Sequence, residues 1–409
     1  MSLDSVAETV AEQIRRQEFV ELLAHHDADG IAAGSILCHA MLRAGIRFRM
    51  RIRQGVTTAY LKEEGAHLLC DLGAGIADLP PETMVVDHHL PKFEGVFHAN
   101  PRLAGIDGDR ELSAAGMAYL VAQKMGDNRD LAGLVIPGII GDGQEISGKN
   151  LEIFNEGISD GIIVPDRGIT LPGRDMAERW YLATSPYLDG ISGGEQLIAD
   201  LLDQARDLAK GENTSRLDIL LSRVILEAAP HSTLAALNAI YGDTYHLQRE
   251  VMDDAHALTA VIDACGKSGH GDMGASLCLR SSTYQDQAWE IARQHRTNVI
   301  GAIRKIEPLK GTAIIYEVQD TFLASDVADI LTRDLLNMWP VLVYAKAGNC
   351  CKISARCPAG IPTELGPLVS NLAEACGGNG GGHIHRAGAT IPCGKIGTFT
   401  KGWQEAFGA

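Results

Sequence analysis

The sequence predicts an α/β protein whose N-terminal part is a mainly parallel sheet flanked by helices, joined by a helical linker to a smaller α/β domain. Two observations lead to this prediction. Short apolar runs alternate with helical patterns in the first third of the chain, which is typical of βαβ units. The chain of 409 residues also exceeds the usual size of one hydrophobic core, so two domains are expected.

Composition limits the class of protein further. The apolar fraction of 45% and the charged fraction of 22% are ordinary for a globular chain. A formal net charge of -16 argues against binding nucleic acid chiefly by bulk electrostatics, but it leaves room for a local basic groove. The nine cysteines lack CxxC spacing and predict reduced thiols. The charged, amphipathic start and the absence of a membrane-length apolar run predict a cytoplasmic protein with no membrane association.

The first strand ends in a carboxylate-bearing turn. The apolar run Phe19–Ala24 is followed by His25-His26-Asp27-Ala28-Asp29-Gly30, and a helical pattern continues to Ala44. Open α/β sheets place their sites at the carboxyl ends of parallel strands. Two carboxylates one residue apart beside an imidazole suit a divalent cation, whereas an isolated Asp before Gly ordinarily only caps the next helix. This stretch taken alone leaves both interpretations open.

Two later strands also end in polar residues. Strands are predicted at Phe48–Arg53, His67–Cys70 and Met84–Val86. Asp71 follows the second, and Asp87-His88-His89 follows the third. Because right-handed crossovers bring the carboxyl ends of parallel strands to one edge of the sheet, these side chains are expected to meet.

A fourth carboxylate follows a helix. Helices are predicted at Leu112–Met125 and Arg129–Ile140, and the second runs into Gly141-Asp142-Gly143. An Asp between glycines is ordinarily a turn residue. The place of Asp142 after an apolar helix also lets it face the sheet edge.

The rest of the chain divides by composition. Residues 150–191 are interrupted by Gly and Pro and are expected to be an irregular insertion within a first domain of residues 1–192. Residues 193–243 return to helical periodicity and are expected to link it to a second domain, residues 244–409.

The second domain contains a glycine-rich stretch, Gly377–His383, which is expected to be a loop ahead of a strand at Ala387–Ile391. Exposed backbone amides bind anions, and His383 and Arg386 suit phosphate oxygens. Glycine-rich sequence otherwise marks a flexible connector with no ligand.

In this order, the motifs resemble those of the DHH phosphoesterase superfamily, named after the triplet Asp87-His88-His89. The C-terminal Gly380-Gly381-Gly382-His383, with Ala387-Gly388, is similar to the DHHA1 substrate-binding domain, and Ser354-Ala355-Arg356 resembles its strand with a phosphate-facing Arg. The chain length, the insertion and the stretch Asp263–Gly266 look most like archaeal RecJ-like single-strand nucleases.

The resemblance implies a role for each motif residue. One metal ion would be held by His25, Asp27 and Asp71, and the other by Asp29, Asp71, His88 and Asp142. His89 would contact the scissile phosphate, and Asp87 would orient a ligand. The substrate-binding residues of the second domain would be Ser354, Arg356, Gly381, Gly382, His383 and Arg386. Oxygen-rich ligands with a few imidazoles favour two Mn²⁺ ions, with Mg²⁺ as the alternative, over zinc.

Three functions are expected from this resemblance. The first is a metal-dependent phosphodiesterase or exonuclease that hydrolyses single-stranded DNA or RNA from an end by two-metal activation of water, in DNA replication or repair. The second is a phosphodiesterase of short oligonucleotides or cyclic dinucleotides. The third is a helicase- or replisome-associated binding subunit, because a eukaryotic helicase component looks like a degenerate relative of this superfamily. A scaffold of that kind is expected to lose metal ligands, and every ligand position is present here.

Overall fold

The computed structural model describes residues 2–62, 65–209, 215–309, 314–335, 337, 339–358, 360–361 and 363–407. The chain forms two compact units, one of residues 1–168 and 243–292 and the other of residues 169–242 and 293–409. In the described part of the chain, no helix is both long enough and apolar enough to cross a membrane. The cysteines are free thiols, and most of them are buried.

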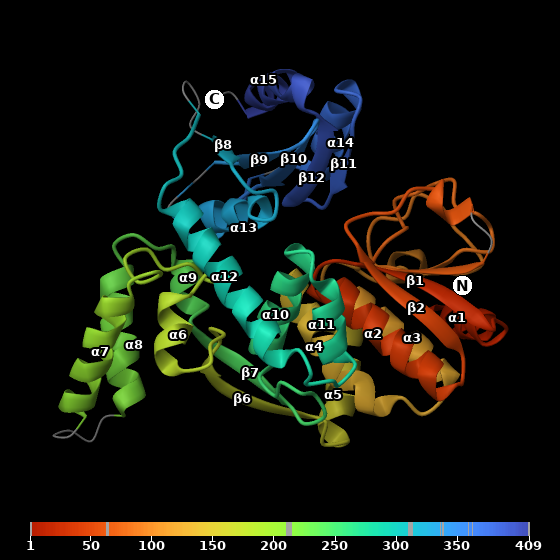
Figure 1. Cartoon of the computed structure of the whole chain (residues 1–409), viewed down its shortest axis with the longest axis horizontal. Helices are drawn as coiled ribbons and strands as arrows, with labels where there is room; N and C mark the ends of the chain where they lie inside the picture. Colours follow the sequence, from red (N-terminus) through yellow and green to blue (C-terminus); the bar gives the residue numbers. More distant parts are fainter. Residues whose placement is uncertain are drawn as a thin grey trace. The chain divides into compact units, whose positions relative to one another are not determined.

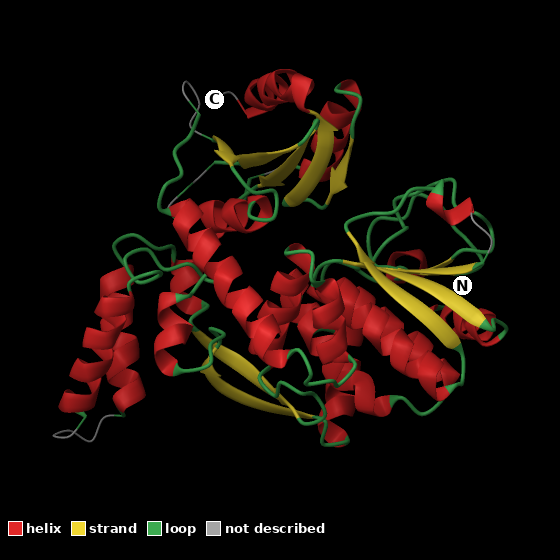
Figure 2. Cartoon of the chain, viewed as in Figure 1, coloured by secondary structure: helices red, strands yellow, loops and turns green. Residues whose placement is uncertain are grey.

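The first unit is built on a five-stranded sheet in the order β2-β1-β3-β4-β5, in which every neighbouring pair is parallel (Figures 1 and 2). This confirms the predicted mainly parallel sheet. Its strands are β1 (Phe19–His25), β2 (Arg47–Arg53), β3 (Ala66–Cys70), β4 (Met84–Val86) and β5 (His98–Ala99).

Helices pack on one face of this sheet, where alternate strand residues such as Leu22 and Leu68 enter the largest hydrophobic core. The other face is covered by loops over a smaller cluster that includes Leu23 and Leu69. Successive strand residues point to opposite faces, so each strand contributes to both layers. The helices of the first unit are α1 (Leu3–Arg15), α2 (Ala28–Arg43), α3 (Ala114–Met125), α4 (Val135–Asp142), α5 (Gly148–Ser159), α10 (Ala255–Lys267) and α11 (Gly271–Cys278), and α12 (Gln285–Ile303) begins in it.

Two features of the chain's organisation differ from the sequence-based expectation. Residues 150–191, expected to be irregular, contain most of α5, strand β6 (Ile163–Ile169) and helix α6 (Met176–Tyr181). Most of the Gly and Pro residues lie at or between the ends of these short elements, so they mark the boundaries of regular secondary structure. Residues 243–292, expected to begin the second domain, pack into the first unit, because α10 and α11 contribute buried side chains such as Val261 and Leu277 to the core around α2.

The second unit contains a sheet in the order β11-β12-β10-β9-β8. Its strands are β8 (Ile315–Val318), β9 (Val341–Ala347), β10 (Cys350–Arg356), β11 (Asn379–Gly382) and β12 (Arg386–Pro392). The first three neighbouring pairs of this order are antiparallel, and β8 runs parallel to β9. One face packs against α14 (Leu365–Ala375) and α15 (Ile396–Phe407). The stretch 193–243 contains α7 (Glu195–Leu208), α8 (Arg216–Ala228), α9 (Leu234–Asn238) and the start of β7 (Tyr241–Leu247).

The glycine-rich stretch is more regular than expected. Asn379–Gly382 forms the edge strand β11, which pairs with β12, instead of a loop. Glycine permits this because the strand lies very close to α14: a Cβ atom on Gly380 would approach Ala373 Cβ and the Val369 carbonyl oxygen to 3.0 Å. The backbone of these glycines is therefore extended because the strand packs against a helix, which the local sequence does not reveal.

Candidate metal centre

The carboxyl ends of β1, β3 and β4 meet at one edge of the parallel sheet. Ala24 pairs in register with Cys70, and Cys70 with Val86, so His25, Asp71 and Asp87 each follow neighbouring strand ends. Asp71 has a φ of 56°, a left-handed conformation that is uncommon for a residue other than glycine. Its backbone N–H donates to the Val86 carbonyl at 2.8 Å, which keeps the turn against β4.

Asp27 combines the two roles that its sequence left open. Its Oδ1 atom accepts a hydrogen bond of 3.0 Å from the Gly30 N–H and so caps α2. Its Oδ2 atom lies 2.7 Å from His25 Nδ1, and the same nitrogen lies 3.2 Å from Asp71 Oδ2. Gly30 is required here, because a Cβ atom at that position would overlap the backbone and Cβ of His25.

Asp29 is completely buried and is anchored to a different helix. Its two carboxylate oxygens accept the backbone N–H groups of Ala114 and Ala115 at 2.7 and 2.8 Å, at the N-terminus of α3. Its Oδ2 atom also lies 3.8 Å from His88 Nε2. Asp29 therefore does not cap α2, the helix that contains it, but accepts the first backbone N–H groups of α3, whose N-cap is Ser113.

His88 is held with one ring nitrogen directed at the carboxylates. Its Nδ1–H donates to the Gly108 carbonyl at 2.5 Å. Its Nε2 lies 3.4 Å from Asp71 Oδ1 and 3.2 Å from Asp142 Oδ2. A metal-binding imidazole is commonly fixed in this way, with its other N–H donated to a carbonyl group.

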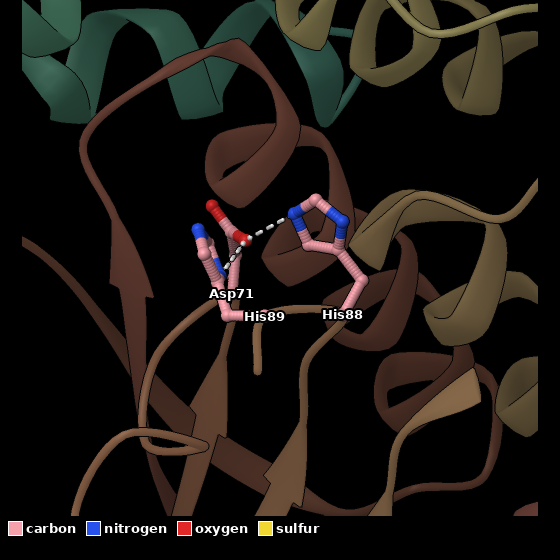
Figure 3. Close-up of side chains that lie close together, drawn as sticks. All are labelled: Asp71, His88 and His89. Carbon is pink, nitrogen blue, oxygen red and sulfur yellow. Dashed lines mark ion pairs between the residues drawn. The ribbon is translucent and has the colours of Figure 1, made fainter. Parts of the chain in front are cut away.

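His89 lies beside the same carboxylate but is more accessible. Its Nδ1 is 3.4 Å from Asp71 Oδ1 and 2.8 Å from Asp87 Oδ1, and its side chain is 37% exposed against 4% for His88. Figure 3 shows the ion-pair contacts of Asp71 with both imidazoles. His89 is therefore the more accessible of the two imidazoles.

The Asp87 side chain accepts hydrogen bonds that hold the backbone of the triplet in place. Its Oδ1 accepts the backbone N–H groups of His88 and His89, at 2.7 and 3.1 Å, and Oδ2 accepts the Ala74 N–H at 2.9 Å. Burial raises the pKa of Asp87, but the nearby imidazoles of His89 and His88 and these hydrogen bonds outweigh it, so its pKa lies well below the usual range. Asp87 therefore remains an anion that orients both histidines.

The crowding of buried carboxylates disfavours the ionised form of Asp29 and Asp142. Burial, together with Asp142 and Asp71, raises the pKa of Asp29 well above its usual value, and burial and other nearby carboxylates raise the pKa of Asp142 to about 6. Conversely, burial lowers the pKa of His25 and His88, but the surrounding carboxylates outweigh it and raise both pKa values. The cluster therefore attracts cations.

The donor set fits a divalent metal. Asp71 Oδ1 and Asp142 Oδ2 are buried side-chain oxygens with no hydrogen-bond partner in the described structure. Three groups have ligand atoms within 4.8 Å of one another, with Asp71 in two of them: His25, Asp27 and Asp71; Asp29, His88 and Asp142; and Asp71, His88 and His89. Carboxylate oxygens with a few imidazoles suit Mn²⁺ or Mg²⁺.

Several residues that support the site were missed from the sequence. Gln144 Nε2 donates to the Gly108 carbonyl at 2.9 Å and lies 3.3 Å from His88 Nδ1. Arg102 Nε donates to the His88 carbonyl at 2.8 Å, and Asn100 Nδ2 to the His89 carbonyl at 2.9 Å. Only the position of Gln144, two residues after Asp142, could have suggested its role; Asn100 caps and Arg102 lies in a short 3-10 helix, Pro101–Ala104, that the sequence analysis did not predict.

The candidate substrate-binding residues lie together on the second unit's sheet. Ser354 and Gly381 both pair with Gly388, from opposite sides of β12, so three small residues line one face in a row. A Cβ atom on Gly381 would meet open space, so this face is accessible there. Gly382 and His383 continue from β11, where the His383 N–H donates to the Arg386 carbonyl at 2.7 Å.

Two arginines sit opposite each other beside this row. Arg356 pairs in register with Arg386, and Asp329 lies between their charges. Asp329 accepts hydrogen bonds from Nε and Nη2 of Arg356 at 2.6 and 3.2 Å, and its Oδ1 lies 3.8 Å from Arg386 Nε. The Arg386 side chain is 45% exposed against 13% for Arg356, which makes Arg386 the more accessible cation.

Known proteins resemble both parts of the chain. Residues 310–408 match the DHHA1 domain model. The chain is 26% identical over 431 aligned residues to the uncharacterised protein MJ0831 of Methanocaldococcus jannaschii, covering 99% of this chain and 97% of that protein.

Solved structures share the fold at low sequence identity. RecJ of Thermus thermophilus, in complex with Mn²⁺, matches 98% of this chain with a TM-score of 0.61 and 18% identity, and the chain spans about half of it, 53%. CDC45 of Entamoeba histolytica matches over the full length of both chains, with a TM-score of 0.64 and 11% identity. Residues 310–408 therefore match a DHHA1 domain, and the chain as a whole shares its fold with RecJ and CDC45.

Proposed function

We propose that this protein is a metal-dependent phosphodiesterase that hydrolyses single-stranded nucleic acid from an end, in DNA replication or repair. One observation carries the proposal: the buried oxygens Asp71 Oδ1 and Asp142 Oδ2 have no hydrogen-bond partner in the described structure and face His88 Nε2. A buried polar oxygen without a hydrogen bond is costly, and a pair of divalent cations would supply the missing interactions. The Mn²⁺ complex of the similar RecJ supports this choice of metal.

Each residue would have a defined task. His25, Asp27 and Asp71 would hold one cation, and Asp29, Asp71, His88 and Asp142 the other. When bound, such a pair lowers the pKa of a water molecule and offsets charge that develops on the phosphate. Asp71 can serve both sites because Oδ2 faces His25 and Oδ1 faces His88.

His89 is suited to the scissile phosphate. Burial lowers its pKa, but Asp87 outweighs this effect and raises the pKa above the ordinary value. With Nδ1–H donated to Asp87, the other N–H of the protonated ring would donate to a phosphate oxygen or the leaving group when substrate is bound. In the second unit, Arg386 and His383, with Arg356, Ser354 and the amides of Gly381 and Gly382, would bind a phosphate group.

Hydrolysis of end-labelled DNA and RNA oligomers of graded length tests the proposal. Wild-type protein with Mn²⁺ should give a ladder of products that shortens from one end, and Asp71→Ala should abolish it. The exposed Asp78→Ala, in the loop after the same strand, is the matched control and should keep full activity. Unchanged hydrolysis by Asp71→Ala would contradict the two-metal arrangement, and hydrolysis of dimers alone would favour a phosphodiesterase of short or cyclic dinucleotides.

The similarity to CDC45 favours a second candidate, a replisome- or helicase-associated binding subunit. Its full-length match in both chains is the observation behind it. Metal binding separates the two candidates, because a scaffold has no need of the cluster around Asp71. Calorimetric titration with Mn²⁺ that shows no binding, together with absent hydrolysis, would favour the subunit.

A further inference from the structure

The edge strand β2 carries an arginine at every second position. Its sequence is RFRMRIR, and the intervening Phe48, Met50 and Ile52 pack against the helix-side core. The arginines therefore project from the opposite face, which the helices do not cover. We call this set the arginine row: Arg47, Arg49, Arg51 and Arg53.

A single buried carboxylate organises the middle of the row. Glu21, on the neighbouring β1, pairs in register with Arg49, and its Oε2 accepts a hydrogen bond from Arg49 Nε at 2.6 Å. Its Oε1 lies 2.7 Å from Arg51 Nε and accepts the Tyr60 hydroxyl at 3.2 Å. One negative charge thus serves two guanidinium groups. Within the described ranges Arg47 and Arg53 form no ion pair, so the row keeps a net positive charge.

This concentration of positive charge is not expected from the composition. The chain has 52 acidic against 36 basic residues, yet four of the seven residues of β2 are arginine. Charged residues on an edge strand also discourage pairing with another chain. Protection of the edge from pairing with another chain does not require that all four charges have the same sign. It also does not require the guanidinium group, which binds phosphate oxygens in a bidentate manner.

The row begins at the metal centre. Arg53 pairs in register with His25, and Arg47 pairs with Phe19 at the far end of the strand. A strand rises roughly 3.3 Å per residue, so neighbouring arginines of the row are roughly 6.6 Å apart and the row is roughly 20 Å long. That repeat is close to the separation of successive phosphates in an extended single strand. Among the strands that the structure describes, β2 is at the edge of its sheet (Figure 1).

We propose that the arginine row binds the phosphates of a single nucleic-acid strand whose end lies in the metal centre. The proposal rests on the proposed function for where that end lies. Arg53 would contact the phosphates nearest the centre, and Arg47 those several nucleotides away. Glu21 would act as a positioning residue that keeps Arg49 and Arg51 extended across the face.

Two single variants test the row by position. Arg47→Gln and Arg53→Gln each remove one positive charge from the row. The control is Arg16→Gln, at the end of α1 in the same unit, because the Arg16 side chain is also exposed, at 68%. Binding of 5′-fluorescein-labelled oligothymidylates of three and twelve nucleotides is followed by fluorescence anisotropy, with Ca²⁺ replacing Mn²⁺ to suppress hydrolysis. Thermal melting confirms that each variant is folded.

We expect Arg47→Gln to weaken binding of the 12-mer but not of the trimer, and Arg53→Gln to weaken both. Each variant should reduce the slope of log K against log salt for the 12-mer by about 0.7, so its deficit relative to wild type shrinks roughly threefold between 50 and 200 mM salt. Arg16→Gln should match the wild type. Unchanged 12-mer binding by Arg47→Gln, or an equal loss for both lengths, would overturn the proposal.

The outcome separates this proposal from the proposed function. If Arg47→Gln weakens 12-mer binding but the protein hydrolyses no oligomer with Mn²⁺, the proposed role of the arginine row stands and the proposed hydrolase function is wrong. If the protein hydrolyses oligomers but Arg47→Gln does not change 12-mer binding, the proposed hydrolase function stands and the proposed role of the arginine row is wrong.

Discussion

His88 Nε2 lies 3.2 Å from Asp142 Oδ2, although His88 follows a strand and Asp142 ends a helix. The approach of α4 to the sheet edge depends on glycine. A Cβ atom on Gly138 would overlap the Asp29 carboxylate, and one on Gly141 would lie 2.8 Å from Ala28 Cβ. The candidate metal centre is thus shaped by backbone packing between α2 and α4 as well as by its carboxylate and imidazole side chains.

Gly138→Ala should therefore impair metal binding although Gly138 carries no ligand atom. The added methyl group displaces Asp29, which weakens Mn²⁺ binding and destabilises the fold by about 1–3 kcal/mol. Gly301→Ala is the matched control in α12, where a Cβ atom meets open space and the better helix propensity of Ala should stabilise by up to ~1 kcal/mol. Calorimetric titration and thermal melting measure both effects. Equal Mn²⁺ affinity in the two variants would contradict this account.

Gln144→Ala should lower metal affinity without removing a ligand. Gln144 donates to the same Gly108 carbonyl that fixes His88, so its loss loosens that imidazole. Loss of such an outer contact lowers metal affinity by roughly 10–100-fold. Titration of activity with Mn²⁺ should show a higher half-saturation point but a maximum close to wild type. The exposed Gln196→Ala should leave the titration unchanged, and a lowered maximum for Gln144→Ala would assign it a direct catalytic role instead.

Asp329 should make the second unit acid-sensitive. Burial raises its pKa, but Arg356 and Arg386 outweigh this, so its pKa in the folded state lies below the ordinary value. A depressed pKa stabilises the fold above the unfolded pKa of about 3.9, and that contribution is lost as pH falls through the folded value. Asp329→Asn should cost about 2 kcal/mol at pH 7, and the difference from wild type should shrink below pH 4.

Urea unfolding at pH 7 and pH 3.5 measures this change. Asp203→Asn serves as the control, because its ion pair with Arg206 joins two largely exposed side chains on one helix. A deficit for Asp329→Asn that is independent of pH would show that its carboxylate charge is not what holds the opposed arginines.

Gly380 and Gly381 should respond in opposite ways to the same substitution. Gly380→Val is expected to destabilise the protein by about 1–3 kcal/mol, because its Cβ would meet α14 at 3.0 Å. Gly381→Val, which points into open space, should leave the melting temperature nearly unchanged but cover the row formed with Gly388 and Ser354 and weaken oligonucleotide binding. Melting and anisotropy measurements distinguish them, and normal oligonucleotide affinity of Gly381→Val would exclude this face from the binding site.

Local sequence patterns were enough to predict the parallel sheet and the polar residues that follow its strands. Strand periodicity is local, and the rule that parallel strands end at one edge is general, so His25, Asp71 and Asp87 could be placed together from spacing alone. The order of the motifs then indicated a resemblance to the DHH superfamily, and the DHHA1 part of it is matched over residues 310–408.

Which atoms face the centre depends instead on tertiary packing. Asp27 and Asp29 are one residue apart, yet one caps α2 and the other binds the N-terminus of α3, because helix N–H groups from a distant segment arrive beside Asp29. The return of residues 243–292 to the first unit and the extended form of β11 have the same origin. Each of these features depends on contacts between segments that are remote in sequence. No local pattern encodes the energy of such contacts, yet they decide which motif residues come together in one site.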